Sequence, residues 1–382
     1  MSKWEKVKLK DVILIDKNII SPGDINDQQI YIGLEDIEKE NGNINEKYVR
    51  ESNIKSNKFI FTEEHILYGK LRPNLNKVCL PEFKGICSTD IYPILVKRNR
   101  AEKAYIFHIL HSQEFVKYAS NRTSGANLPR VNEKVIYEYE ISLPPLETQK
   151  QIAKTLNIAA VLLAMRKQQL AELDNLIKSI FYEMFGENNI YIEKSLIELI
   201  VEGAGLSYGI VQPGEDIGKG IGILRPIDIN HGTISMTNIK RIPPDVEEPY
   251  KKTRLNGNEI LITVRGTTGE TALTDQKHMG MNVTRGIAVI RQNNSLINRI
   301  FLNEYLKSGI GQRFIRENTK GATLKQINLS VLREMRISLP PLPLQKQFAA
   351  RVTKIEEQKA LVQKAIDETQ YLFDSLMSEY FE

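Results

Sequence analysis

The sequence predicts an α+β protein in which two similar mixed α/β domains are joined by two long helices that form an antiparallel coiled coil. Three observations support this fold class. The chain contains a repeat of about half its length, each copy opens with short β-rich runs, and each copy closes with a long heptad-patterned segment. A repeat of this length indicates a duplicated domain and not a solenoid of short units.

The repeat is clearest toward the end of each copy. The segment Ile-Ser-Leu-Pro-Pro-Leu stands at Ile141–Leu146 and again at Ile337–Leu342, an offset of 337 − 141 = 196 residues. The segments that begin with Gly125-Ala126 and Gly321-Ala322 match at the same offset. Near the start of the copies, Trp4 aligns with Tyr191 at an offset of 191 − 4 = 187. The second copy therefore carries 196 − 187 = 9 additional residues, which we expect in loops.

The first part of each copy mixes strands, turns and a helix. Apolar runs predict strands at Lys58–Phe61 and Glu259–Val264, and Gly and Asn predict turns at residues 41–43 and 256–258. The spacing of apolar residues predicts one amphipathic helix in each copy, near Ala104–Ser120 and Ile297–Arg316. Strands and helices do not alternate regularly, so a doubly wound sheet is not indicated.

Each copy then ends in a long helix, which the Pro-Pro pairs at 144–145 and 340–341 begin, since proline fits the first turn of a helix but not its interior. Apolar residues follow at alternating steps of four and three, the 3.5-residue period of a coiled coil. Gly186 follows the first helix, as expected of a C-terminal cap. The predicted apolar seam consists of Ile152, Leu156, Leu163, Leu170, Leu173, Ile177 and Ile180 in the first helix, and Phe348, Val352, Ile355, Val362, Ile366, Phe373 and Leu376 in the second.

Polar residues interrupt the seam at Arg166, Lys359 and Thr369. Two interpretations are open. The long side chains could extend out of the seam into water, or they could fix the register of the two helices. We favour the first.

These patterns divide the chain into a first domain at residues 1–145, a first helix at 146–186, a second domain at 187–341 and a second helix at 342–382. A helix of about 35 residues would be about 52 Å long at 1.5 Å per residue. That length corresponds to about 15 base pairs of B-DNA.

The composition favours a soluble protein of the cytoplasm. No run is apolar and long enough to span a bilayer, and no signal-peptide core follows Met1. The chain has only two cysteines, Cys79 and Cys87, which is too few for a disulfide framework. The net charge of +5 favours an anionic partner such as a nucleic acid, although only weakly in a chain of 382 residues.

The duplicated Gly-Ala-x-Leu-x-x-Val/Ile-Asn segment, followed by Ile-Ser-Leu-Pro-Pro-Leu-x-x-Gln-Lys-Gln and a heptad helix, resembles the DNA-specificity subunit of type I restriction–modification systems. The resemblance covers residues 4–382. It implies two target-recognition domains that each read one half of a bipartite double-stranded DNA site, and helices that set the spacer and dock methyltransferase (modification) subunits. It also implies a restriction subunit as a further partner.

The sequence offers no convincing catalytic motif. The Pro-Pro pairs lack the residues with which an adenine methyltransferase holds a flipped base, and residues 214–220 match a phosphate-binding loop poorly. His108 and His111 could share a helical face, but no third ligand accompanies them, so a packed or solvent-facing pair is favoured over a metal site. We therefore expect no cofactor or metal here. The resemblance implies that S-adenosylmethionine, ATP and Mg²⁺ bind only to partner subunits. A fused methyltransferase or nuclease and a coiled-coil scaffold that binds only protein remain alternatives.

Basic and small polar residues in loops are the candidates for DNA contact, because arginine binds guanine or phosphate, whereas lysine and hydroxyl groups more often bind phosphate. An ordinary role as surface loop residues is the alternative for each. The candidates are Lys70, Arg72, Arg122, Thr123 and Arg130 in the first copy, and Arg265, Thr267, Thr268, Lys320, Lys325 and Gln326 in the second.

Overall fold

The computed structural model describes residues 4–40, 42–52, 54–125, 127–186, 190–203, 206–321 and 324–381. Its contacts divide the chain into two compact units. Unit 1 comprises residues up to Lys167 together with Lys364 onward, and unit 2 comprises Gln168–Gln363. The predicted domain limits stay predictions, because this division runs through both long helices.

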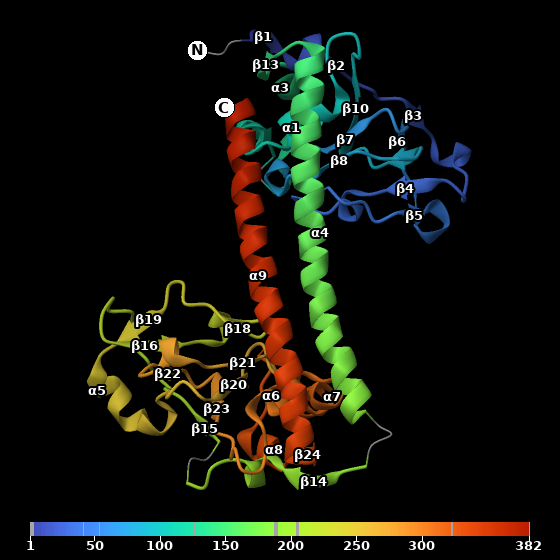
Figure 1. The fold of residues 1–382 in the computed structure, drawn as a ribbon. Coiled ribbons are helices and arrows are strands. Elements are labelled where there is room, and N and C mark those ends of the chain that lie inside the picture. The colour runs from blue at the N-terminus through green and yellow to red at the C-terminus, as the bar shows by residue number, and fades with distance from the viewer. Residues whose placement is uncertain are drawn as a thin grey trace. The chain divides into compact units, whose positions relative to one another are not determined.

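Unit 1 has two main sheets (Figure 1). One has the strand order β2-β10-β7-β8 and the other the order β3-β6-β9-β4-β5, in which only β4 and β9 pair in parallel. The strands are β1 Glu5–Lys8, β2 Ile13–Ile15, β3 Ile19–Ile20, β4 Ile30–Ile32, β5 Lys47–Tyr48, β6 Lys58–Phe61, β7 Ile66–Gly69, β8 Val78–Cys79, β9 Gly85–Cys87, β10 Ile91–Val96, β11 Thr123–Ser124, β12 Arg130–Val131 and β13 Glu140–Leu143. The helices outside the coiled coil are α1 Lys103–His111, α2 Gln113–Ser120 and α3 Glu133–Tyr137.

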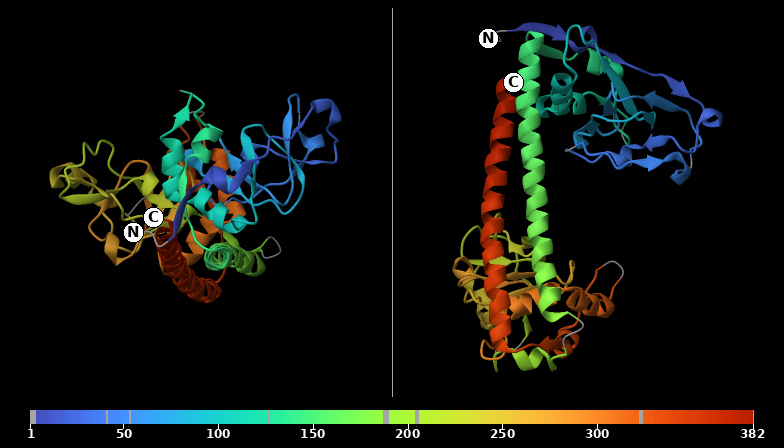
Figure 2. Two further views of the ribbon diagram at one scale, coloured as in Figure 1. Left: turned by 90° about the horizontal axis from the view of Figure 1, so that it is seen from above. Right: turned by 45° about the vertical axis from the view of Figure 1, so that its right-hand side comes forward.

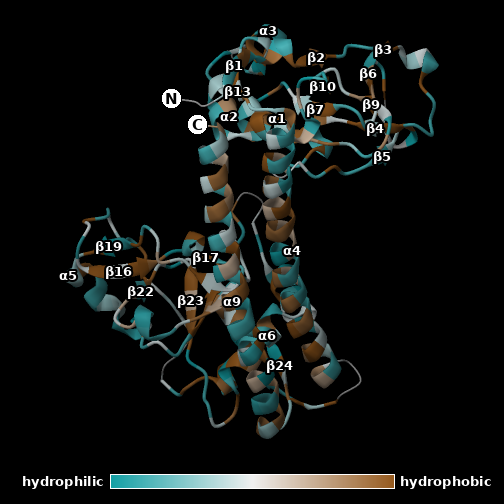
Figure 3. Ribbon diagram, turned by 45° about the horizontal axis from the view of Figure 1, so that its top comes forward, coloured by the Kyte–Doolittle hydropathy of each residue, from teal (hydrophilic) through white to brown (hydrophobic). Residues whose placement is uncertain are grey.

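Unit 2 repeats this plan with sheets of order β15-β23-β20-β21 and β19-β16-β22, and β16 and β22 are its parallel pair. Apolar strands such as β16 and β23 are brown in Figure 3. The strands are β14 Ile192–Ser195, β15 Ser207–Tyr208, β16 Ile221–Leu224, β17 Ile229–Asn230, β18 Thr233–Ile234, β19 Lys240–Ile242, β20 Ile260–Thr263, β21 Thr271–Leu273, β22 Asn282–Val283, β23 Ile287–Ile290 and β24 Arg336–Leu339. The helices are α5 Pro244–Glu247, α6 Arg299–Lys307, α7 Gly309–Asn318 and α8 Leu329–Glu334.

The strand registers confirm the sequence repeat. Glu5 of β1 pairs with Leu143 of β13, and Ile192 of β14 pairs with Leu339 of β24. The first members of the two pairs differ by 192 − 5 = 187 and the second by 339 − 143 = 196, which are the two offsets of the repeat. The additional residues of the second copy therefore lie between these strands.

The long helices are α4 (Leu146–Phe185) and α9 (Leu342–Phe381), each of 40 residues and hence about 60 Å long. In unit 1, Ile152 and Leu156 of α4 belong to the core against which Phe373 and Leu376 of α9 pack. In unit 2, the C-terminal part of α4 and the N-terminal part of α9 share a core. Within each unit the two helices are thus antiparallel, as predicted (Figures 1 and 2). Gly186 caps α4 through its N–H, which donates to the Tyr182 carbonyl oxygen at 2.9 Å.

The polar interruptions of the seam bind across it. The Arg166 guanidinium donates to Thr369 Oγ1 and to the Ala365 carbonyl oxygen, both in α9. Lys359 Nζ lies 2.6 Å from a carboxylate oxygen of Asp174 in α4. Burial acts to lower the pKa of Lys359, but the hydrogen bonds to Asp174 and Glu356 outweigh it and raise the pKa. The favoured interpretation, extension into water, is wrong for Arg166, and cross-helix pairs of this kind can fix register.

The predicted amphipathic helix of each copy is two helices. Ser112 lies between α1 and α2 in an extended conformation, and its hydroxyl accepts a hydrogen bond from the Phe115 N–H, which caps α2. Ser308 separates α6 from α7 in the same way. Apolar spacing continues through the break, whereas a serine that caps the next helix stops the first one. None of the helices in the described ranges is long and apolar enough to cross a membrane.

Candidate nucleic-acid interface

Candidate residues from separate parts of each copy meet at the ends of strands. Leu71 and Arg130 form a β-bridge in unit 1, and Arg265 and Gln326 form the corresponding bridge in unit 2. We call residues 70–77, 88–90, 121–125 and 127–130 the unit 1 rim. Residues 264–270, 284–286, 319–321 and 324–327 are the unit 2 rim.

Arg72 of the unit 1 rim has a left-handed backbone, with φ of 52°. Its N–H donates to the Pro129 carbonyl oxygen at 2.8 Å, which holds the loop after β7 against the loop before β12. The side chain is exposed, and no described residue binds its guanidinium. A non-glycine residue in this conformation carries strain, which is often found at binding sites.

Arg130 and Lys70 lie close to Arg72 but are engaged by Asp90. The Arg130 guanidinium binds Asp90 through two hydrogen bonds of 2.8 and 3.1 Å. Lys70 Nζ lies 4.0 Å from the same carboxylate and 4.9 Å from the centre of the Tyr92 ring. The hydrogen bond from Arg130 is the main reason why the pKa of Asp90 is lowered. This network favours a positioning role for Arg130 and Lys70.

The remaining candidates of unit 1 lie on the loop after α2. The Arg122 guanidinium stacks 4.0 Å from the centre of the Tyr118 ring, so a flat, exposed cation is held at the surface. Thr123 pairs with Val131 in the β11–β12 ladder, and its hydroxyl donates to the Ser120 carbonyl oxygen at 3.2 Å. Ala126 of the Gly-Ala segment lies outside the described residues.

In unit 2, the loop after β20 folds against the loop before α8. The Gly266 N–H donates to the Lys325 carbonyl oxygen at 2.8 Å, and Lys320 forms a bridge with Gln326. Thr268 Oγ1 lies 3.3 Å from the hydroxyl of Thr319. Thr267, Lys320, Lys325 and Gln326 are exposed and Arg265 is half-buried. Ala322 and Thr323 lie outside the described residues.

Arg72 and Arg265 do not occupy equivalent positions on their loops. Arg72 and Gly266 both donate to the loop before the bridging residue and both have positive φ, whereas Leu71 and Arg265 occupy the bridge. The two copies therefore carry their arginines on equivalent loops, but at positions that differ by one residue. The pattern of apolar residues alone could not resolve this shift, and Asp90, 40 residues from Arg130 in the sequence, gave no signal either.

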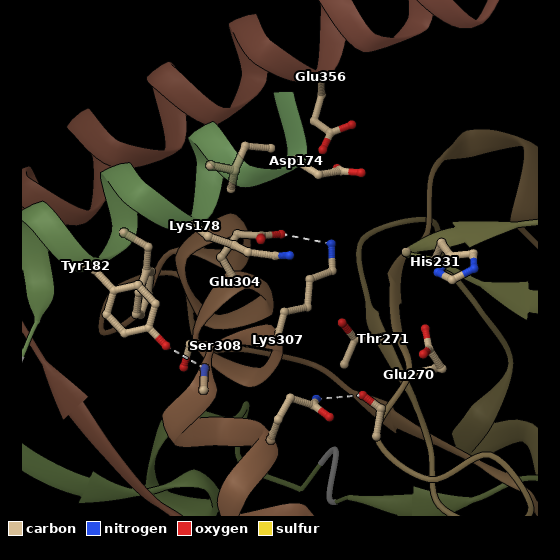
Figure 4. Close-up of a pocket in the computed structure, with 16 residues that line it drawn as sticks. Asp174, Lys178, Tyr182, His231, Glu270, Thr271, Glu304, Lys307, Ser308 and Glu356 are labelled. Atoms are coloured by element: carbon tan, nitrogen blue, oxygen red, sulfur yellow. Dashed lines mark hydrogen bonds and ion pairs between the residues drawn. The ribbon is translucent and has the colours of Figure 1, made fainter. Parts of the chain in front are cut away.

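A cavity of about 310 Å³ lies in unit 2 between α4, α6, α7 and the start of β21 (Figure 4). Its charges are largely paired: Lys307 Nζ lies 3.0 Å from Glu304, and Asp174 and Glu356 bind Lys359. The Gly309 N–H donates to the Tyr182 hydroxyl at 2.8 Å. None of the DNA-contact candidates lines this cavity.

His108 is buried, and His111 is half-buried. His108 is 2% exposed and its Nε2 lies 2.7 Å from Asn157 Oδ1, while His111 Nε2 lies 2.8 Å from the Glu40 carbonyl oxygen. Across the described residues, no group of three or more His, Cys, Asp or Glu side chains has the geometry of a metal site. The glycine-rich loop at 214–220 is organised by Asp216, whose carboxylate accepts from the N–H groups of Gly218 and Arg241.

The chain matches the sequence model of a family described as type I restriction modification DNA specificity domain, over residues 1–175 and 224–370. It is 23% identical over 310 residues to the specificity subunit of the type I restriction enzyme EcoBI of Escherichia coli, which covers 74% of this chain and 65% of that protein. It is 30% identical over 189 residues to the EcoDI specificity subunit of E. coli, with 48% and 42% covered. The MjaVIII specificity subunit of Methanocaldococcus jannaschii is 24% identical over 382 residues, with 92% and 86% covered. The match thus spans less than two thirds of the two E. coli relatives.

Two solved structures share the fold. A type I restriction–modification S subunit from M. genitalium superposes with a TM-score of 0.60 at 14% identity, covering all of this chain and 96% of that one. A chain from a study of the complex assembly and conformational transition of a type I system has a TM-score of 0.57 at 20% identity, with 99% and 97% covered.

Proposed function

The chain belongs to the family of the type I restriction–modification DNA specificity domain, and we propose that it is the subunit that reads a bipartite site on double-stranded DNA for a type I complex. Each unit reads one half-site. In this proposal the chain itself performs no catalysis, and S-adenosylmethionine, ATP and Mg²⁺ bind only to its methyltransferase and restriction partners. Such a complex acts on DNA in the cytoplasm.

The observation that carries this proposal is the pair of rims. Both units bring the loop after an equivalent strand, β7 or β20, against the loop that precedes α3 or α8. The framework is the same, but the polar side chains differ: Arg72 and Arg122 are exposed in one unit, and Lys320 and Lys325 are exposed beside the half-buried Arg265 in the other. A common framework with different polar groups is what two different half-sites require.

The test is selection from random double-stranded DNA by the full chain, co-expressed with the methyltransferase subunits of its host. We expect enrichment of two short motifs separated by an unread spacer. A pool without such a motif would favour a scaffold that binds only protein. Methylation of DNA by the isolated chain would instead support a fused enzyme.

We further propose that the methyltransferase subunits dock on the long helices. Beside the buried seam, α4 carries an apolar stripe in unit 1, formed by Ile158, Val161, Leu162 and Met165, which are 59, 58, 40 and 63% exposed. Their spacing of three and four residues puts them on one helical face. Exposed apolar patches on soluble proteins commonly mark protein interfaces.

Ile158→Glu together with Met165→Glu should abolish co-purification with the methyltransferase subunits. The matched control replaces exposed polar residues of the same helix, Lys154→Glu and Lys167→Glu, and should leave the complex intact. Equal loss in both double variants would argue against the stripe as the docking face.

The long helices are also proposed to set the spacer, because the seam holds them in one register within each unit. A rigid element of fixed length suits the separation of two half-sites, as dimer geometry does in other DNA-binding proteins.

A further inference from the structure

The ends of two parallel strands of unit 2 place two residues at its rim that are not among the candidates from the sequence. Because β16 and β22 are parallel, with Leu224 opposite Val283, their C-terminal ends lie at the same edge of the sheet. The chain leaves β16 through residues 225–228 and leaves β22 through residues 284–286. The side chains that follow are Ile227 and Arg285.

Three contacts fix these turns against each other and against the rim. The Thr284 N–H donates to the Leu224 carbonyl oxygen at 2.9 Å, and the Val264 N–H donates to the Gly286 carbonyl oxygen at 2.8 Å. A Cβ atom on Gly286 would lie 2.5 Å from Cγ of Pro226, so glycine permits this close approach. Ile227 and Arg285 are therefore adjacent in the chain to residues that touch, and Arg265 directly follows Val264.

Hydrogen bonds between Asp228 and Arg225 stabilise the turn that carries Ile227. The Asp228 carboxylate accepts from the Arg225 N–H at 2.7 Å and binds the Arg225 guanidinium through hydrogen bonds of 3.0 and 2.8 Å. The charge of Arg225 is therefore compensated by the ion pair with Asp228. The side chain of Ile227, in contrast, is 81% exposed to solvent. Arg285 is exposed and no described side chain or carbonyl group binds its guanidinium. A single exposed isoleucine is ordinary on a protein surface. Ile227 is distinguished by its position close to Arg285, whose guanidinium has no partner among the described residues.

The equivalent turns of unit 1 carry different chemistry on the same backbone. There the Gly33 N–H donates to Asp36 at 2.6 Å, the Ser88 N–H donates to the Ile32 carbonyl oxygen at 2.9 Å, and the Lys70 N–H donates to the Asp90 carbonyl oxygen at 2.9 Å. These bonds match Ile227 to Glu35 and Arg285 to Thr89. Glu35 is bound by Lys47 at 3.0 Å, so an apolar tip in one unit is an ion-paired carboxylate in the other.

We propose that Ile227 and Arg285 are specificity-determining residues of the half-site that unit 2 reads. Ile227 contacts the 5-methyl group of a thymine, and Arg285 donates two hydrogen bonds to a guanine. Both are contacts that the major groove offers to these side-chain types. The inference rests on the proposed function, since it assigns residues to the reading surface of unit 2.

The test uses the full chain in complex with the methyltransferase subunits and a random double-stranded DNA pool. Ile227→Ala and Arg285→Ala should both change the same single half-site and leave the other half-site and the spacer unchanged. Arg285→Ala should reduce discrimination at one guanine by about ten- to a hundredfold. Arg285→Lys should lose it as well, because lysine keeps the charge but not the planar pair of donors. The control is Ile217→Ala, another exposed isoleucine of unit 2, which should keep the wild-type motif.

The isoleucine is tested with DNA in which uracil replaces thymine in that half-site, which removes only the methyl group. Wild-type affinity should fall about fourfold, the value of one buried methyl-sized group, and the affinity of Ile227→Ala should not change further. An unchanged motif in both variants, or equal sensitivity of both proteins to uracil, would overturn the inference while the wild-type motif upholds the proposed function. Uniform weakening of Arg285→Ala on all sequences would also overturn it, since that marks a phosphate contact. If the wild-type chain selected no bipartite motif, the proposed function itself would be refuted.

Discussion

Protonation of His108 should destabilise unit 1 over a defined pH range. The side chain is buried between α1 and α4, where Nε2–H donates to Asn157 Oδ1 at 2.7 Å and Nδ1 has no partner among the described residues. Burial is the main cause that lowers the pKa of His108 from 6.5 to about 4. At 1.36 kcal/mol for each pKa unit, this difference corresponds to about 3 kcal/mol.

The direction in which stability changes with pH follows from the number of protons that the folded and unfolded chains bind. Between pH 6.5 and 4 the unfolded chain binds a proton at His108 and the folded chain does not, so stability is full above pH 6.5 and falls as the pH drops toward 4. Below about pH 4 this contribution is constant. His108→Gln keeps a donor for Asn157 and cannot titrate.

The assay is urea unfolding at pH 4 to 7. Trp4, the single tryptophan, packs against the core of unit 1, so its fluorescence reports on that unit. The difference in unfolding free energy between wild type and His108→Gln should change by about 3 kcal/mol across this range. Subtraction removes the titration of the carboxylates that both proteins share. A difference that stays constant from pH 7 to 4 would refute the argument.

Three further outcomes are expected. Arg265→Ala should weaken one half-site by about 1–3 kcal/mol if the side chain reads a base; competition with single-base variants of the site checks this, and equal weakening on every sequence would mark a phosphate contact instead. Asp90→Asn should release Arg130 and alter the half-site read by unit 1 alone, as measured by selection from random DNA; a changed second half-site would contradict the assignment. Deletion of four residues from α4 shortens it by about 6 Å and should shift or abolish the preferred spacer, so an unchanged spacer would show that the helix does not set it.

The sequence predicted the parts of the fold that depend on periodicity. The repeat, the mixed α/β domains and the seam of α4 and α9 follow from spacings of apolar residues, and the structure has them. The break at Ser112 was not predicted, because a capping serine leaves the apolar period intact.

Pairings between polar residues that are distant in the chain could not be predicted from the sequence. Arg166 meets Thr369 only because the helices are antiparallel in one register. Arg130 meets Asp90 only because Lys70 forms backbone hydrogen bonds to both Asp90 and Val131. The one-residue shift between Arg72 and Arg265 likewise needed the bridge partners to be known. The candidate DNA contacts stay predictions, now grouped into two rims.

The division of the chain into units has a consequence for its synthesis. Unit 1 is completed by residues 364–381, where Phe381 packs with its ring centre 5.4 Å from that of Tyr105. These residues leave the ribosome only after all of unit 2. Part of the apolar surface of unit 1 therefore stays uncovered while unit 2 is translated, and a prematurely terminated chain would leave unit 1 incomplete.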